Sequence, residues 1–227
     1  MSHLDHLLAL VPQLSKGKIL DVGAGRGDFI LSAARRGINV VGLEYNPEYI
    51  EEAKERANRE HLTINLVQGK GEYLPFQDRT FLFANLSEVI EHVRDPRLVL
   101  SEVYRVLQPG GSAYVSAPNR FGIRDPHFHL YGINWLPRSW AHRLIGFLRK
   151  HKPYSQEAGL QRIDEMHYYT FGAFKRFLEE LGFTVMDIRI LKMRRKLSRF
   201  LYPFGLALYS AVLRPIWFDT AHVLATK

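Results

Sequence analysis

Three glycines at alternate positions form the turn most suited to binding a ligand. The stretch ILDVGAGRGDF spans residues 19–29, with Gly23, Gly25 and Gly27 following an apolar run and preceding a helical pattern. Glycine lacks the side chain that would keep a ligand away from the backbone N–H groups at the start of a helix. The pattern G-x-G-x-G by itself fits a dinucleotide enzyme and a purely structural turn as well.

Glu44 makes the ligand-binding interpretation more specific. It closes the second apolar run, about twenty residues after the turn. An acidic side chain at this position can accept hydrogen bonds from both ribose hydroxyls of an adenosine group. With the turn before it, Glu44 is predicted to be a cofactor ligand rather than a surface residue.

The elements that must position these residues alternate between apolar runs and helical patterns, which is typical of a parallel sheet covered by helices. Strands are predicted at residues 18–22, 39–44, 62–67, 80–86, 112–117, 183–190 and 221–226. Helices are predicted at residues 28–36, from 46, from 95 to 108, and from 170 to 181. Asn-Pro and Asp-Pro pairs start two of these helices, because Asn or Asp caps the helix and Pro suits its first turn.

Three further segments complete a family pattern: QGKGEYLPF at 68–76, EVIEHVRDP at 88–96 and RVLQPGGSAYVSAPN at 105–119. With the glycine turn, they resemble class I S-adenosylmethionine-dependent methyltransferases, in particular the branch that includes the quinone-biosynthesis enzymes. The resemblance is strong over residues 17–119 and weaker over 166–227. It implies an α/β, Rossmann-like, doubly wound sheet of seven mostly parallel strands with an antiparallel last strand.

The resemblance also implies the cofactor, S-adenosylmethionine, and the residues that bind it. Asp21 is expected to help position the methionine end of the cofactor, the glycine turn to give it room, and Glu44 to bind the ribose. Many relatives carry Asp where this chain has Lys70, so adenine recognition is expected to rely on backbone groups near Gly71. The residues expected beside the adenine and the methionine moiety are Gly71, Glu72, Leu86 and Ser87.

The reaction is attack by an acceptor atom on the methyl carbon of a sulfonium, so the protein chiefly aligns the two partners. A hydroxyl acceptor would need a general base, for which Glu88, Glu91 and His92 are candidates near the strand ends. A carboxylate acceptor needs none. A structural or orienting role for Glu91 and His92 also stays open.

The segment after the fifth strand is too long for a simple connection, and residues 120–168 are predicted to form an inserted lid over the acceptor. It contains His127 and His129, either of which is a candidate base or substrate ligand, or an ordinary loop residue. No metal site is predicted, since the sequence offers no third ligand for this pair.

A basic and then apolar segment lies at residues 192–218, between the last two predicted strands. Five basic residues are followed by fourteen residues without a charge, a run shorter than the roughly twenty that cross a bilayer. Such a segment suits a helix lying in a membrane interface. It also suits a flap that packs on the lid or on a second copy of the chain, and nucleic acid is the least favoured partner.

Composition agrees with a folded protein of one domain, residues 1–227. Hydrophobic residues make up 46% of the chain, charged residues 24%, and cysteine is absent, which excludes disulfides and thiolate metal sites. The N-terminal segment lacks the pattern of a signal peptide, so a cytoplasmic location is expected. Residues 1–120 hold 14 Lys and Arg against 15 Asp and Glu, a balance of −1, while residues 121–227 hold 17 against 8, a balance of +9.

The sequence therefore predicts methyl transfer to a small molecule, and it favours a lipid, an isoprenoid or a lipid-linked sugar as the acceptor. Peripheral contact with the inner membrane face and formation of a homodimer are further possibilities. Two alternatives stay open. An RNA methyltransferase would use the basic half to neutralise phosphates. A non-catalytic partner subunit would bind the cofactor without transferring a methyl group.

Overall fold

The computed structural model describes residues 2–148 and 162–227. The chain divides into two compact units. The first comprises Met1–Val89, Asp95–Tyr114 and Thr226–Lys227, and the second comprises Ile90–Arg94 and Val115–Ala225. The predicted lid at 120–168 and the predicted insertion at 192–218 both fall in the second unit. The single domain at 1–227 stays a prediction.

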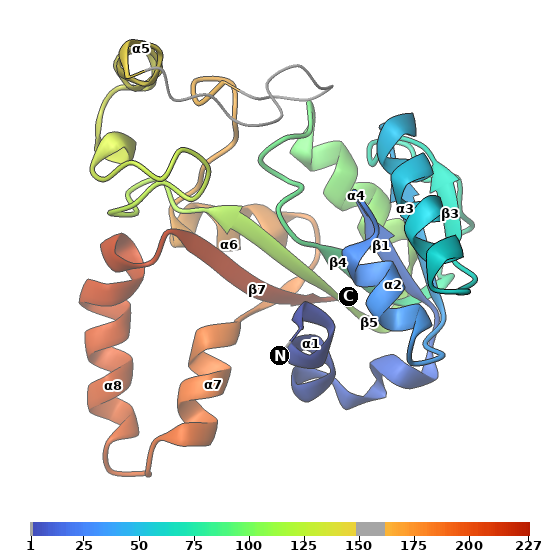
Figure 1. The fold of residues 1–227 in the computed structure, drawn as a ribbon. Coiled ribbons are helices and arrows are strands. Elements are labelled where there is room, and N and C mark those ends of the chain that lie inside the picture. The colour runs from blue at the N-terminus through green and yellow to red at the C-terminus, as the bar shows by residue number, and fades with distance from the viewer. Residues whose placement is uncertain (1, 149–161) are drawn as a thin grey trace. The chain divides into compact units, whose positions relative to one another are not determined.

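The first unit alternates strands and helices as predicted (Figure 1). Its strands are β1 (Ile19–Val22), β2 (Val40–Glu44), β3 (Asn65–Gln68), β4 (Phe81–Leu86) and the start of β5 (Leu107–Pro118). Its helices are α1 (His3–Leu10), η1 (Pro12–Lys16), α2 (Asp28–Ala34), α3 (Pro47–Arg59) and α4 (Pro96–Val106). β1 and β2 are buried throughout, as strands covered on both faces must be.

The helix starts follow the capping rules. The Asn46 side chain accepts a hydrogen bond from the N–H of Glu48 at the start of α3. The Asp95 side chain accepts one from the N–H of Leu98 at the start of α4. Both caps satisfy backbone N–H groups that have no partner within the helix.

The seven strands form one sheet in the order β3-β2-β1-β4-β5-β7-β6. β1 pairs in parallel with β2 and β4, and β2 with β3. β7 (Thr220–Thr226) runs antiparallel to β5, because Lys227 bonds to Gly110 and Gly111 whereas Asp219 bonds to Asn119. The predicted fold class, including the antiparallel last strand, is confirmed.

The second unit contains the remaining elements. They are η2 (Ile133–Trp135), α5 (Arg138–Phe147), α6 (Phe171–Glu180), β6 (Thr184–Asp187), α7 (Ile188–Lys196), α8 (Tyr202–Leu208), the π-helical η3 (Tyr209–Trp217) and most of β7. Buried Phe128, Ile133, Ala141, Ile145 and Ile163 form an apolar core under α5. The predicted lid at 120–168 includes residues 149–161, which lie outside the described residues.

One predicted strand is wrong over its second half. Residues 183–190 were expected to be extended, but β6 ends at Asp187 and α7 begins at Ile188. The Asp187 carboxylate accepts a hydrogen bond from the N–H of Arg189 at 2.9 Å and so caps the helix. The predicted strand did not take this cap into account.

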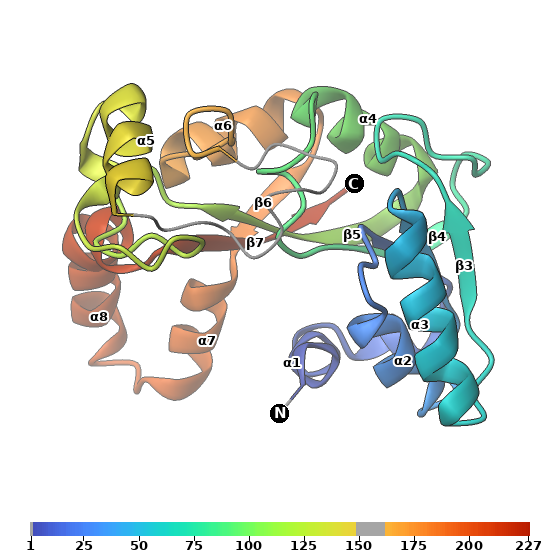
Figure 2. The same cartoon turned by 45° about the horizontal axis from the view of Figure 1, so that its top comes forward.

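The insertion at 192–218 forms a helical hairpin. α7 and α8 stand side by side in Figures 1 and 2, joined by a short turn. A Cβ added to Gly205 on α8 would lie only 2.7 Å from Cδ1 of Leu197, so glycine permits the close approach of the two arms. Among residues 2–148 and 162–227, no helix is both long and apolar enough to cross a membrane.

Candidate active site

The glycine turn follows β1 directly. Its φ angles are positive, 68° at Gly23, 53° at Gly25 and 87° at Gly27, a region that residues with side chains rarely adopt. A Cβ on Gly25 would meet only a backbone oxygen, at 4.0 Å, so the turn has open space beside it. A Cβ on Gly27 would lie 2.9 Å from that of Ala53, so this glycine lets α2 pack closely on α3.

Glu44 is held against this turn at the carboxyl end of β2. Its Oε2 accepts a hydrogen bond from the N–H of Gly25 at 2.8 Å. Its Oε1 accepts bonds from the N–H groups of Tyr45 and Asn46, each at 2.8 Å. Three of the carboxylate's roughly four acceptor positions are thus used, and one remains on Oε2 for a ribose hydroxyl.

Asp21 is buried in β1, with 2% of its surface exposed. Its Oδ1 accepts a hydrogen bond from Nδ2 of Asn85 at 2.7 Å, whereas its buried Oδ2 has no hydrogen-bond partner among the described residues. Burial raises the pKa of Asp21 to about 7, the charge of Glu44 adds to this rise, and the bond from Asn85 opposes it. A nearby cation, such as the ammonium of a bound amino acid, would stabilise the ionised carboxylate.

Helix α1, which was not predicted from the sequence, reaches this site. His3 of α1 places its Nε2 2.9 Å from Oδ1 of Asn85 and its ring 4.8 Å from that of Tyr114. Ser2 and Asp5 form a capping box that starts α1. The Ser-x-x-Asp spacing was the available signal for this helix.

The residues predicted beside the adenine and the methionine moiety also lie in the first unit. Leu86 is fully buried at the end of β4 and Ser87, next to it, is half-buried. Gly71 packs closely, since a Cβ there would lie 3.3 Å from Val99, and Glu72 follows it half-buried. The Nζ of Lys70 lies 4.9 Å from the ring centroid of Tyr45.

A second group of polar residues lies in the second unit. Nε2 of His127 is 3.5 Å from Oε1 of Glu91, and the rings of His127 and His92 are 5.0 Å apart. One ligand atom from each of the three residues lies within 4.8 Å of the others. The structure thus brings together three predicted candidates from two distant segments, and the sequence did not indicate that Glu91 and His92 are neighbours of His127. The arrangement suits proton transfer, and its spacing also suits a divalent cation.

Asp125 positions this group. Its Oδ1 accepts hydrogen bonds from the N–H groups of His127 and Phe128 at 2.9 and 2.7 Å, and its Oδ2 accepts the hydroxyl of Tyr168 at 2.8 Å. Burial, together with the charge of Asp125, raises the pKa of Tyr168, so this hydroxyl stays protonated. His167 donates its N–H to the carbonyl of Glu91 at 3.2 Å, which fixes the segment from the other side.

The other two predicted bases lie in exposed turns. His129 has a φ of 57° and donates its N–H to the carbonyl of Asp125 at 3.0 Å. The H-x-H pair therefore does not act as one cluster in the described structure, because the left-handed turn directs His129 to the surface. Glu88 has a φ of 58° and is exposed in the first unit.

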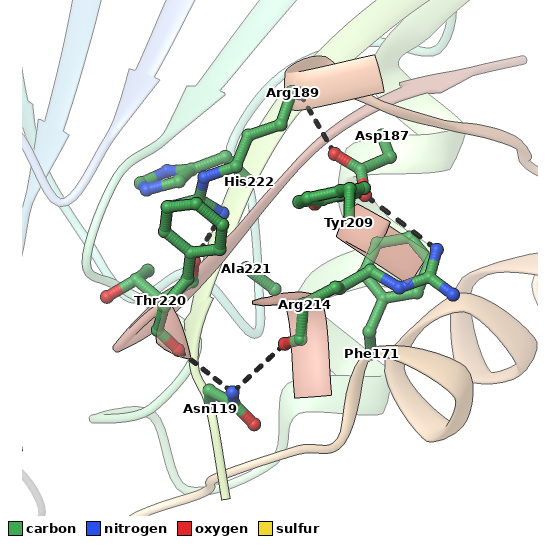
Figure 3. A pocket seen from close by; sticks show the side chains of 10 residues that line it. Asn119, Phe171, Asp187, Arg189, Tyr209, Arg214, Thr220, Ala221 and His222 are labelled. Carbon is green, nitrogen blue, oxygen red and sulfur yellow. Dashed lines mark hydrogen bonds and ion pairs between the residues drawn. The ribbon is translucent and has the colours of Figure 1, made fainter. Parts of the chain in front are cut away.

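A pocket of the second unit lies beside the base of the hairpin (Figure 3). There Asp187 accepts the hydroxyl of Tyr209 at 2.6 Å and lies 3.9 Å from Nη1 of Arg214. Nδ2 of Asn119 donates to the carbonyls of Pro215 and Phe218, both at 2.9 Å. These groups satisfy one another, so we assign the pocket to the attachment of the hairpin rather than to ligand binding.

Comparison with known proteins agrees with the fold and the turn. A family model described as a methyltransferase domain matches residues 20–115. The demethylmenaquinone methyltransferase of Chlorobaculum tepidum is 32% identical over 124 residues, which cover 53% of this chain and 50% of that protein. The ubiquinone biosynthesis O-methyltransferase of Coxiella burnetii is 30% identical over 166 residues, covering 68% of this chain and 69% of that one. The chain thus spans about half the length of the first relative.

Among solved structures, phosphoethanolamine N-methyltransferase 2 of Haemonchus contortus, in complex with S-adenosyl-L-methionine, is similar in fold. It superposes with a TM-score of 0.63 at 18% identity, covering 99% of this chain and 51% of that one. The strand order and the glycine turn define an α/β protein that binds a nucleotide-like cofactor. The chain belongs to the class I S-adenosylmethionine-dependent methyltransferases.

The methyl donor of this family is S-adenosylmethionine. The residues present suit it, because the buried Oδ2 of Asp21 can accept from an ammonium group and Glu44 can accept from a ribose hydroxyl. The space beside Gly25 leaves room for the cofactor backbone.

Proposed function

We propose that the protein transfers the methyl group of S-adenosylmethionine to a lipid, an isoprenoid or a lipid-linked sugar. The family model and the cofactor cradle support methyl transfer. The observation that carries the lipid character of the acceptor is the exposed apolar surface of the α7–α8 hairpin. The names of the two curated relatives, which refer to menaquinone and ubiquinone, favour the same class of acceptor.

The hairpin has the two surfaces that binding to an anionic membrane requires. Phe200, Phe204 and Leu208 follow one another at intervals of four residues and are 85%, 78% and 55% exposed. Phe204 and Leu208 are four residues apart and share one face of α8, and Phe200 is exposed in the turn just before this helix, so we treat the three side chains as one exposed apolar stripe. Four basic residues near the tip are also exposed: Arg194, Arg195, Lys196 and Arg199. Basic residues beside an apolar stripe suit the headgroup region of an anionic leaflet, such as the inner membrane face.

When bound, S-adenosylmethionine supplies the activated methyl group. Asp21, Glu44 and the glycine turn hold it in the first unit. For a hydroxyl acceptor, His127 accepts the proton while Glu91 stabilises the imidazolium that forms, and His92 packs against the His127 ring. Glu88 and His129 remain alternative proton acceptors. A carboxylate acceptor would need none of these groups.

We further propose that residues 120–168 line the acceptor site as a lid. The described parts of this segment, 120–148 and 162–168, carry the His127 loop, α5 and Tyr168. Residues that follow the carboxyl end of a strand such as β5 line the ligand crevice in doubly wound folds.

The test is transfer of radiolabelled methyl into a host extract that is then partitioned into organic, aqueous and RNA fractions. Label in the organic phase is the expected result. A Gly25→Leu variant is the control, because its side chain would fill the space beside the turn while meeting few neighbours. Circular dichroism checks that this variant folds, since its φ of 53° strains any residue but glycine.

Other outcomes of the same experiment contradict the proposal. Label confined to RNA would indicate that the basic residues of 121–227 contact RNA phosphates. Label confined to the aqueous fraction would exclude a lipid acceptor. Cofactor binding without transfer into any fraction would favour a non-catalytic partner subunit.

A further inference from the structure

Two arginines of the second unit lie close together without a carboxylate partner. Arg120 follows β5 and Arg138 begins α5, which is labelled in Figure 1. Nη2 of Arg120 donates to the carbonyl of Leu136 at 3.2 Å, which brings its guanidinium to the chain two residues before Arg138. Among residues 2–148 and 162–227, neither guanidinium forms an ion pair with a carboxylate.

Both guanidinium groups keep a donor that is buried and unused. Nη1 of Arg120 and Nη1 of Arg138 are inaccessible to solvent and have no hydrogen-bond acceptor among the described residues. A buried N–H group without an acceptor costs free energy, and more so when it is charged. An oxyanion that accepted from both groups would remove this cost.

The surroundings keep the two positive charges partly desolvated. The Cζ of Arg138 lies 3.9 Å from the ring centroid of Tyr168, and the Cζ of Arg120 lies 5.1 Å from that of Phe121. Burial and the neighbouring charge of Arg120 lower the pKa of Arg138. Two carboxylates act on Arg138 from a distance, and both have other partners: Asp125 accepts hydrogen bonds from His127, Phe128 and Tyr168, and Asp164 accepts from Arg162.

This arginine pair adjoins the proposed proton acceptor. The ring of Tyr168, on which Arg138 stacks, lies 6.1 Å from the ring of His127. A ligand held by the arginines can therefore reach the Glu91–His127 pair within one unit of the chain. This relation distinguishes the arginine pair from an ordinary basic surface.

We propose that Arg120 and Arg138 form an oxyanion-binding site that holds the acidic group of the acceptor, either a carboxylate or a phosphate. This inference rests on the proposed function for the identity of the ligand as an acceptor. Guanidinium groups suit both kinds of oxyanion, because each presents several N–H donors in one plane. The site selects acceptors that carry a negative charge a short distance from the atom that is methylated.

Direct binding tests the site without any methyl transfer. Pyrophosphate and benzoate are titrated into the purified protein by isothermal calorimetry at constant ionic strength, to separate a phosphate from a carboxylate preference. At least one is expected to bind at one site per chain. Arg120→Gln and Arg138→Gln should each weaken that binding at least about tenfold, because a charge-assisted hydrogen bond is lost.

The matched control is Arg143→Gln, which removes the same charge from an exposed position on the same helix. It should leave the affinity within about twofold, since exposed charges are screened. Arg120→Lys and Arg138→Lys keep the charge and serve if a Gln variant fails to fold. They should still weaken binding, because an ammonium group cannot reproduce the planar donors.

Two results would overturn the inference: neither oxyanion binds the wild-type protein, or Arg143→Gln weakens binding as much as the two site variants. These results are independent of the proposed function. Methyl label found in RNA, together with oxyanion binding, would contradict the lipid acceptor but not the oxyanion site. Label in the organic phase without oxyanion binding would contradict the oxyanion site but not the lipid acceptor.

Discussion

At the scale of single residues, the site depends on two carboxylates, and the fold controls the protonation of one of them, Asp21. Asp21 is buried beside Asn85 and Glu44, and its pKa rises to about 7. Glu44 instead accepts hydrogen bonds from three backbone N–H groups. Two acidic residues on neighbouring strands thus have different environments. A cationic ligand is expected to favour the ionised form of the Asp21 carboxyl group.

The affinity for S-adenosylmethionine should therefore increase with pH up to about 7 and then level off. Below this pH the protonated Asp21 must lose its proton before it can stabilise a cation, so binding releases a proton. Calorimetry in two buffers of different ionisation enthalpy measures this release. An Asp21→Asn variant should bind more weakly and without the pH dependence, and a wild-type affinity that stays constant from pH 5.5 to about 8 would contradict the assignment.

The same residue makes the cofactor-free protein less stable as pH rises. The folded-state pKa of about 7 exceeds the ordinary value of 3.8, so the folded form binds a proton that the unfolded form has lost between these values. The free energy of unfolding should fall across this window in the wild type and change less in Asp21→Asn. Urea unfolding at a series of pH values measures the difference.

His127 should lower the barrier for a hydroxyl acceptor. Replacement by Gln is expected to reduce kcat by a factor of about 10² to 10⁴, as for other general bases, with cofactor affinity unchanged. His142→Gln, at a partly exposed position on α5, serves as the control. If a chelator abolishes the wild-type activity and a divalent cation restores it, the Glu91–His92–His127 cluster holds a metal instead.

At the scale of elements, the α7–α8 hairpin presents apolar side chains that the rest of the described chain does not cover. Its two arms approach closely at Gly205 and attach through Asp187, Tyr209 and Arg214 to the second unit. Because this attachment does not use the exposed stripe, the stripe can be changed without disturbing the fold.

The double variant Phe200→Ser and Phe204→Ser should lose most of its binding to vesicles of phosphatidylcholine and phosphatidylglycerol. Each buried aromatic side chain contributes about 1.5–3 kcal/mol on transfer from water, so the partition coefficient should fall at least about tenfold. Tyr73→Ser removes an equally exposed aromatic residue, 72% exposed, from the first unit. Sedimentation with vesicles measures both, and equal binding of the double variant and the wild type would exclude insertion of the stripe.

At the scale of the whole molecule, the positive charge is concentrated in residues 121–227, with a balance of +9 against −1 in residues 1–120. Residues 121–227 include the basic end of the hairpin and Arg138 of the proposed oxyanion site, and Arg120 directly precedes them. An anionic partner is therefore expected on the second unit, because the first has no excess of positive charge to attract it.

Membrane binding should consequently depend on both lipid charge and salt. Vesicles with phosphatidylglycerol should bind the protein at low salt and release most of it at about 1 M salt, where the screening length falls to about 3 Å. Vesicles of phosphatidylcholine alone serve as the uncharged control. Strong binding to them at either salt concentration would assign the interaction to the apolar stripe alone.

The sequence by itself determined the sheet, the starts of α2, α3, α4 and α6, and the cofactor turn. Asn46 and Asp95 cap helices through bonds to residues two and three positions on, and the glycine turn is formed within a few residues. Such signals are local, so the sequence shows them without knowledge of the tertiary structure. The same local signals missed α1 and α5 and extended β6 over the start of α7, where Asp187 caps the helix.

Only the tertiary structure decided which polar residues share a site. Glu91 and His92 meet His127, from a loop 35 residues further along the chain, and not His129, its neighbour in the H-x-H pair. Arg120 and Arg138 come together in the same way, with Tyr168 stacked on Arg138. These meetings depend on the burial of Phe128, Ile133 and Ile145 in a common core, and burial is a property of the packed chain that no short stretch of sequence contains.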